Sequence, residues 1–148
     1  MALNEDLIKL REETGAGVMD CRAALNEADG DYKKATEIIR EKGLLKAEKR
    51  EGRQTGAGWI DSYIHNERVG VLVELRTETD FVAKSEPFKK LTHELALQLA
   101  ATEAKSEEEF LSQPYIKDES KTIKDLISEL VTKVGENVKL GKFYRVEI

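Results

Sequence analysis

Residues 59–76 read WIDSYIHNERVGVLVELR, and this stretch decides the fold of the 148-residue chain. Apolar and polar residues alternate before and after Asn66-Glu67-Arg68, a spacing typical of two half-buried β-strands joined by a short turn. The second strand places its apolar residues on one face: Val69, Val71, Val73 and Leu75. The stretch therefore predicts an antiparallel hairpin, with strands over 59–65 and 69–76.

Two long helices and a third strand are predicted after this hairpin. One helix begins after Ser85-Glu86-Pro87 and the other ends at Gly135. Their apolar stripes consist of Phe88, Leu91, Leu95 and Leu99 in the first and of Ile123, Leu126, Ile127, Leu130, Val131 and Val134 in the second. A last strand over 138–148 is interrupted at Gly141. The pattern predicts an α+β domain, a small antiparallel sheet packed by helices on one face.

Three short helices are predicted before the hairpin. The first runs from about Asn4 to Glu13, the second follows the turn at 14–17, and the third ends at Gly43. Their apolar stripes contain Leu3, Leu7, Ile8 and Leu10, then Val18, Cys21, Ala24, Leu25 and Ala28, and finally Tyr32, Ala35, Ile38 and Ile39. Short turns join them, so a compact three-helix bundle is expected, too small to be very stable alone.

The composition changes between this bundle and the hairpin. Residues 44–53 are rich in Lys and Arg, and residues 54–58 contain two glycines that interrupt a helix. We therefore predict a three-helix module over 1–43, a basic helical connector over 44–57 and a core domain over 58–148.

Composition excludes several functional classes. Charged residues make up 36% of the chain and the net charge is -5, without the basic excess of a nucleic-acid-binding protein. No apolar run has the length of a signal core or a membrane span, so a cytoplasmic protein with no membrane partner is expected. With Cys21, His65 and His93 as the only cysteine and histidines, no metal site, cofactor or catalytic constellation is predicted.

Residues 78–84, Glu-Thr-Asp-Phe-Val-Ala-Lys, place an acid beside a large aromatic directly after the second strand. Phe81 at such a position needs a pocket, either in its own core or in a partner. In one alternative, Asp80 and Phe81 form a tip that is directed outward. In the other, Asp80 caps a short helix and Phe81 packs inward as its staple.

Met19 lies toward the polar side of the second helix, because its neighbours one turn on are Arg22 and Ala23. An exposed, flexible thioether suits a protein-binding surface. A single exposed Met also occurs on surfaces without any function.

Three motifs resemble the elongation factor Ts family. They are LREETGAGVMDC at 10–21, TDFVAK at 79–84 and VGENV at 134–138. In their order and spacing they extend over nearly the whole chain. The resemblance implies a ubiquitin-associated-like three-helix module followed by a core domain with an antiparallel sheet. It also implies a guanine-nucleotide exchange factor for elongation factor Tu in translation elongation, which is not an enzyme.

The resemblance further implies two groups of contact residues. Thr79, Asp80, Phe81 and Val82 form the tip that enters the partner near its bound GDP and magnesium. Arg11, Val18 and Met19 in the module grip the GTPase domain of elongation factor Tu. For Val18 the two lines of reasoning differ, because the helical stripe makes it at least half buried.

A homodimer is one of two expectations for the assembly. Trp59 and Tyr63 lie opposite Ile60 and Ile64 in the first strand, so both faces of the sheet carry apolar residues. Helices on one face would leave the aromatic face in water, and a two-fold pair would bury it. Alternatively, the module or the 102–122 connection covers this face in a monomer.

The main alternative function is a ubiquitin-associated-like adaptor whose module binds a peptide or helix while the rest serves as scaffold. The Asp80-Phe81 pair argues against it, because an adaptor of this kind does not need such a tip.

Overall fold

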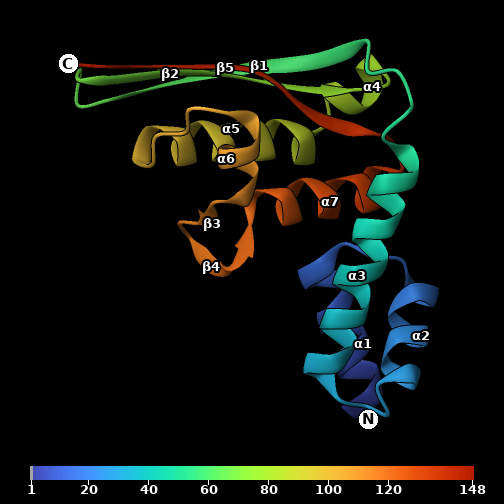
Figure 1. Ribbon diagram of the computed structural model, residues 1–148. Coiled ribbons are helices and arrows are strands. Elements are labelled where there is room, and N and C mark those ends of the chain that lie inside the picture. The colour runs from blue at the N-terminus through green and yellow to red at the C-terminus, as the bar shows by residue number, and fades with distance from the viewer. Residues whose placement is uncertain (1) are drawn as a thin grey trace.

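The structure, a computed structural model, describes the backbone of residues 2–148 and the side-chain burial of residues 4–148. The predicted contribution of Leu3 to the first helix therefore lies outside the described residues. Helices α1 (Ala2–Thr14), α2 (Val18–Glu27) and α3 (Tyr32–Arg50) form the N-terminal module, which hangs below the core domain in Figure 1.

The module has an apolar core of its own. Its buried residues are Leu10, Ala16, Cys21, Ala24, Leu25, Ala28, Ala35 and Ile39. Asp31 caps α3, since its side chain accepts a hydrogen bond from the backbone N–H of Lys34 at 3.3 Å. The predicted stripe of the first helix is wrong for Ile8, whose side chain is 59% exposed. The three-helix arrangement is as expected, and its likeness to ubiquitin-associated modules stays a prediction.

The prediction that the third helix ends at Gly43 is wrong, because α3 continues to Arg50. Gly43 lies where α3 crosses α7 (Ile123–Val134), and a Cβ there would stand 3.4 Å from Thr132 Oγ1. Gly43 therefore lies inside α3, in contact with α7, and does not end the helix. The good helix formers after it keep the helix intact. Module and core are thus joined by a continuous helix, while the limits 1–43, 44–57 and 58–148 stay a prediction.

Polar contacts fix α3 against α7. Arg40 Nε lies 3.2 Å from Asp125 Oδ1, and Asp125 is only 4% exposed. Six residues further along α7, Arg50 donates to the backbone oxygen of Val131 at 3.1 Å. These contacts satisfy buried polar groups at the junction.

The predicted hairpin is confirmed as β1 (Ala57–His65) and β2 (Val69–Thr77). Strand β5 (Val138–Glu147) pairs antiparallel with β2, so the sheet order is β1-β2-β5. The register shifts between Val73 and Leu75, where Glu74 stands opposite the Gly141 region. The interruption predicted at Gly141 is thus a bulge within one strand.

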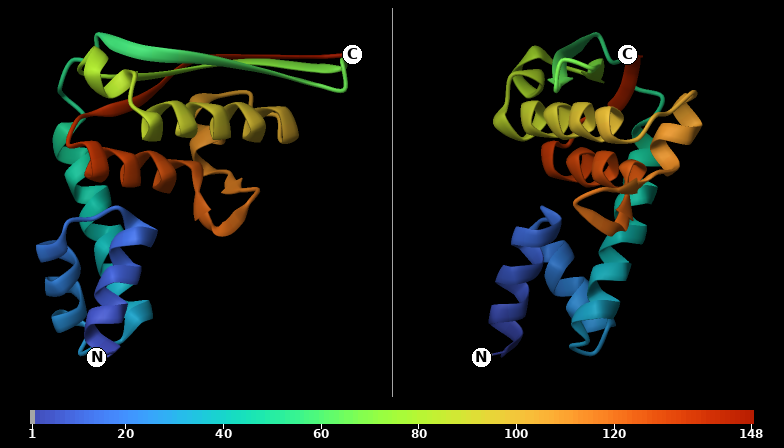
Figure 2. Two further views of the ribbon diagram at one scale, coloured as in Figure 1. Left: turned by 180° about the vertical axis from the view of Figure 1, so that it is seen from behind. Right: turned by 90° about the vertical axis from the view of Figure 1, so that its left-hand side faces the viewer.

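The core domain has the α+β architecture that was predicted. Figures 1 and 2 show α5 (Glu86–Ala101) under the sheet and α7 below α5, with the short α4 (Asp80–Ala83) at one end. The connection between α5 and α7 folds into α6 (Glu107–Ser112) and a hairpin of β3 (Pro114–Tyr115) and β4 (Asp118–Thr122). This second hairpin was not predicted.

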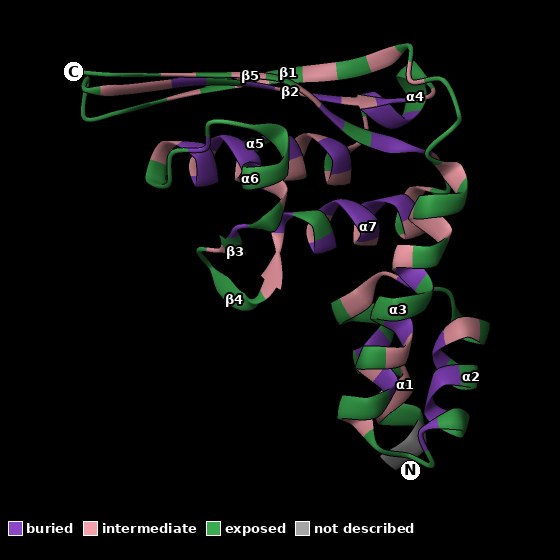
Figure 3. Cartoon of the chain, viewed as in Figure 1, coloured by how far each residue is buried: buried purple, intermediate pink, exposed green. Residues whose placement is uncertain are grey.

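The two faces of the sheet are the reverse of those assigned to it from the sequence. Trp59 and Tyr63 pack against the core, whereas Ile60 and Ile64 on the other face are 63% and 70% exposed. Figure 3 shows the exposed and partly buried positions alternating along β1. The expectation of an open aromatic face is therefore wrong.

The cause of the reversal is the register of the hairpin. Tyr63 pairs with Val71 and Trp59 with Leu75, so the aromatic residues share the buried face of β2. The open face carries Ile60, Ile64, Leu72, Tyr144 and Val146. Neither the module nor the 102–122 connection covers it, since both lie on the helix side of the sheet (Figure 2).

Candidate protein-binding site

Helix α4 presents the Asp-Phe pair at one end of the sheet. Thr79 is the N-cap, and its Oγ1 accepts from the backbone N–H of Val82 at 3.3 Å. Val82 is 7% exposed and packs into the core, whereas Phe81 is 87% exposed. The outward alternative is confirmed, and the inward staple is wrong. Thr79 rather than Asp80 caps the helix.

Glu136 holds the base of this tip. Its Oε1 accepts from the backbone N–H of Thr79 at 3.1 Å, and its Oε2 accepts from Thr79 Oγ1 at 2.8 Å. The fully buried Thr77 places its Oγ1 3.1 Å from Glu136 Oε1 and 2.9 Å from the backbone oxygen of Asn137. Hydrogen bonds to a carboxylate are stronger than neutral ones. Hydrogen bonds thus connect the second sequence motif with the third.

Asn137 extends the anchor to the end of α3. It is 2% exposed, its backbone N–H donates to Glu78 Oε1 at 2.8 Å, and its Nδ2 donates to the backbone oxygen of Arg53 at 2.8 Å. Arg53 also lies 3.5 Å from Glu78 Oε1. Neither Asn137 nor Glu136 was selected from the sequence as a site residue. The only signal was that both lie within the third motif.

Asp80 stands beside Phe81 at the start of α4 and makes no ion pair with any described residue. Both residues are exposed. The tip therefore offers a partner one apolar ring and one carboxylate from a rigid base. Such a tip can fill a pocket and change its electrostatic potential, and no covalent chemistry is needed.

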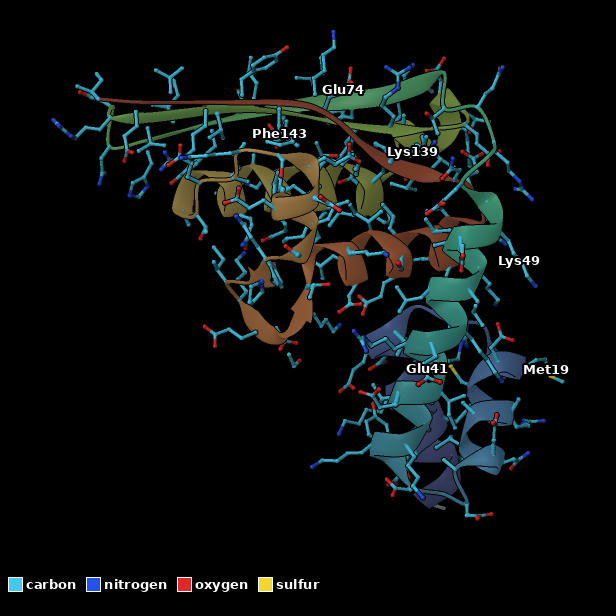
Figure 4. The ribbon with its side chains drawn as sticks, viewed as in Figure 1. Met19, Glu41, Lys49, Glu74, Lys139 and Phe143 are labelled. Atoms are coloured by element: carbon cyan, nitrogen blue, oxygen red, sulfur yellow. The ribbon has the colours of Figure 1, made fainter. Side chains whose placement is uncertain are left out.

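The module residues form a second exposed group, separate from the tip. Met19 is 72% exposed and points away from the bundle in Figure 4. Val18 is 38% exposed, so more than half of it is buried, as its place in the stripe predicts. Arg11 is exposed as well, and it lines a cavity of about 690 Å³ between α1 and the helices α5 and α7. The tip belongs to the core domain, and α3 connects the two groups.

Cys21 and the histidines do not form a catalytic arrangement. Burial raises the pKa of the Cys21 thiol, which keeps it protonated and unreactive. His93 Nδ1 lies 2.7 Å from Asp61 Oδ2 and joins α5 to β1. Within residues 4–148 no three His, Cys, Asp or Glu side chains are grouped as metal ligands. None of the described helices is long and apolar enough to cross a membrane.

Comparison with known proteins gives the same family as the motifs. The family model described as Elongation factor TS matches residues 78–148, which include the tip and the anchoring residues Glu136 and Asn137. Elongation factor Ts of Thermotoga maritima is 42% identical over 193 aligned residues, covering all of this chain and 97% of the relative. The protein of the same name from Thermotoga neapolitana is also 42% identical and is covered to 98%.

The chain belongs to the elongation factor Ts family. Its family is one of the elongation factors of protein biosynthesis. Elongation factor Ts of Clostridium botulinum is 46% identical over 140 residues, but only 46% of that relative is covered. The alignment with the Thermotoga proteins is longer than this chain, so those relatives contain residues that this member of the family lacks.

Proposed function

We propose that this chain is a cytoplasmic guanine-nucleotide exchange factor for elongation factor Tu and promotes GDP release through the Asp80-Phe81 tip. The observation that carries the proposal is the side chain of Phe81, 87% exposed on a helix whose base is held by hydrogen bonds from Thr77 and Thr79. A large ring kept in water at a rigid position is favoured when a partner pocket receives it.

The tip acts as a wedge in this mechanism. Phe81 enters between helices of the GTPase domain near the bound magnesium, and Asp80 brings a negative charge toward that site. Val82, buried in the core, and Thr79, bonded to Glu136, position the tip without having to touch the partner. Displacing the groups that hold magnesium and phosphate weakens GDP binding, so the factor changes an equilibrium and catalyses no covalent reaction.

The module supplies affinity. Arg11, Val18 and Met19 contact the GTPase domain while the core delivers the tip. Met19 supports this role best, because its 72% exposed side chain lies outside the apolar core of the bundle. A flexible thioether adapts to a partner surface at little energetic cost.

Linkage provides the test of the proposal. A factor that promotes release must bind nucleotide-free elongation factor Tu more tightly than the GDP-bound form, and GDP must weaken its binding by the same factor. Titration calorimetry with both forms measures this ratio, which we expect to be at least about a hundredfold, the strong end of typical coupling. Equal affinities would contradict exchange and would favour a ubiquitin-associated-like adaptor.

We also propose a homodimer through the open face of the sheet. Ile60, Ile64, Leu72, Tyr144 and Val146 are each about half exposed or more on this face. Three neighbouring strands contribute them, and together with Ser62 and Glu74 they form one flat, largely apolar area. A two-fold pairing of this area with its copy would remove both from water.

A further inference from the structure

Most exposed large apolar side chains of residues 4–148 belong to the two surfaces already described. Those on the open sheet face or at the end of β5 are Ile60, Ile64, Leu72, Tyr144, Val146 and Ile148. Val18, Met19 and Phe81 belong to the proposed contact with elongation factor Tu. Among the rest is Leu45, 56% exposed on α3, to which neither surface assigns a role.

Leu45 lies between the two proposed contact groups. Its neighbour Lys46 places Nζ 2.8 Å from the carboxylate of Asp20, which directly follows Met19. Three residues beyond the C-terminal end of α3, Arg53 contacts Glu78 at the base of the tip. A helix rises about 1.5 Å per residue, so Lys46 and Arg50 are only about 6 Å apart along α3. One side of α3 therefore connects the contact residues of the module, such as Met19, with the tip at Asp80 and Phe81.

Lys49 shares this side of α3. It follows Leu45 by one helical turn, and residues four apart lie on the same helix face. Figure 4 shows Lys49 and Met19 projecting from the same side of the molecule, and Figure 1 places α4 at the same end.

The charge of Lys49 is not compensated within the described chain. Between positions 42 and 53 the other basic side chains have partners: Lys42 has Glu27, Lys46 has Asp20, Arg50 has the Val131 backbone oxygen and Arg53 has Glu78. Lys49 has no ion pair with any residue that the structure describes. An exposed cation beside an exposed leucine fits a protein surface that has an apolar contact next to a carboxylate.

We propose that Leu45 and Lys49 contact the same GTPase as Met19 and Phe81, so that the binding surface is continuous along α3. Leu45 packs on an apolar part of elongation factor Tu, and Lys49 pairs with an acidic side chain beside it. The inference rests on the proposed function. It adds two specificity-determining residues that neither the motifs nor the tip geometry include.

The test measures the affinity of full-length variants for nucleotide-free elongation factor Tu. Leu45→Gln keeps a good helix former, and we expect it to weaken binding about tenfold, as for a moderate hot spot. Lys49→Glu should weaken binding by a similar factor at low salt and lose most of that effect near 0.5 M salt, where the Debye length is only about 4 Å. Circular dichroism should match wild type for both.

Two control variants carry the same kinds of substitution at exposed positions outside the proposed binding surface. Ile116→Gln alters a similarly exposed apolar residue in the turn between β3 and β4, and Lys33→Glu reverses an exposed lysine at the far end of α3. Both should bind like wild type. If Phe81→Ala weakens binding but Leu45→Gln and Lys49→Glu do not, this inference alone is overturned. If wild type does not bind, both the inference and the proposed function fail.

Discussion

The tip and the open sheet face both expose apolar side chains, but they are built in opposite ways. The tip exposes one ring on a four-residue helix, held from below by Thr77, Glu136 and Asn137. The open face exposes five side chains spread over three hydrogen-bonded strands. A single anchored ring suits a deep pocket in a different protein, whereas a flat apolar area suits a second flat area. Substitutions should therefore separate exchange from self-association.

The largest expected effect is on self-association. Leu72→Lys puts a charge at the centre of the open face, where a buried unpaired charge costs about 3 kcal/mol or more, and two-fold symmetry counts it twice. We expect dimer formation to weaken more than a hundredfold. Sedimentation at micromolar concentration should then give one species near 16.7 kDa.

Ile116→Lys is the matched control, because Ile116 is 45% exposed in the turn between β3 and β4 and Leu72 is 48% exposed. It should leave the doubled mass unchanged. A wild-type protein that sediments as a monomer would remove the basis for the homodimer.

The second effect is on the tip. Phe81→Ala should weaken binding to elongation factor Tu about thirtyfold, since truncating a buried aromatic anchor costs about 2 kcal/mol. Circular dichroism and sedimented mass should stay those of wild type, because the ring is exposed in the free protein. Loss of the fold in this variant would mean that Phe81 serves the core.

A smaller effect is expected from the anchor below the tip. Glu136→Gln removes the charge and one acceptor of the hydrogen bonds to Thr79, so the tip should become more mobile. We expect nucleotide release to slow about fivefold, which corresponds to the loss of about 1 kcal/mol, the net contribution of a typical hydrogen bond. Amide hydrogen exchange at Thr79 should become faster, and Glu147→Gln at the end of β5 should change neither quantity.

The smallest effect is expected at Asp80. Asp80→Asn keeps the size of the side chain and removes its charge, so binding should stay normal while release slows about threefold, as for a charge contact open to water. Stopped-flow fluorescence and calorimetry on the same variant separate the two quantities. Unchanged release would mean that Asp80 has no part in disturbing the magnesium site.

Local patterns in the sequence were sufficient to predict much of the fold. Alternation predicted β1 and β2, helical spacing predicted α5 and α7, and the acid-aromatic pair marked the tip. These features depend on near neighbours only. Gly43 was misleading because a glycine serves both as a helix end and as a place of close helix contact.

Features that join distant parts of the chain could not be predicted in this way. The faces of β1 depend on its register with β2, and a slip of one residue exchanges them. The turn residues Asn66 and Glu67, with φ of 49° and 58°, fix this register. Glu136 lies 57 residues from Thr79, so no local spacing indicated that it anchors the tip.

The rate at which elongation factor Tu releases a fluorescent GDP analogue tests the central claim most directly. The rate should rise with the concentration of wild-type protein well above spontaneous release, and Phe81→Ala at the same concentrations should give a rate close to the spontaneous one. Release that wild type does not accelerate, or that Phe81→Ala accelerates equally, would contradict a tip that drives exchange.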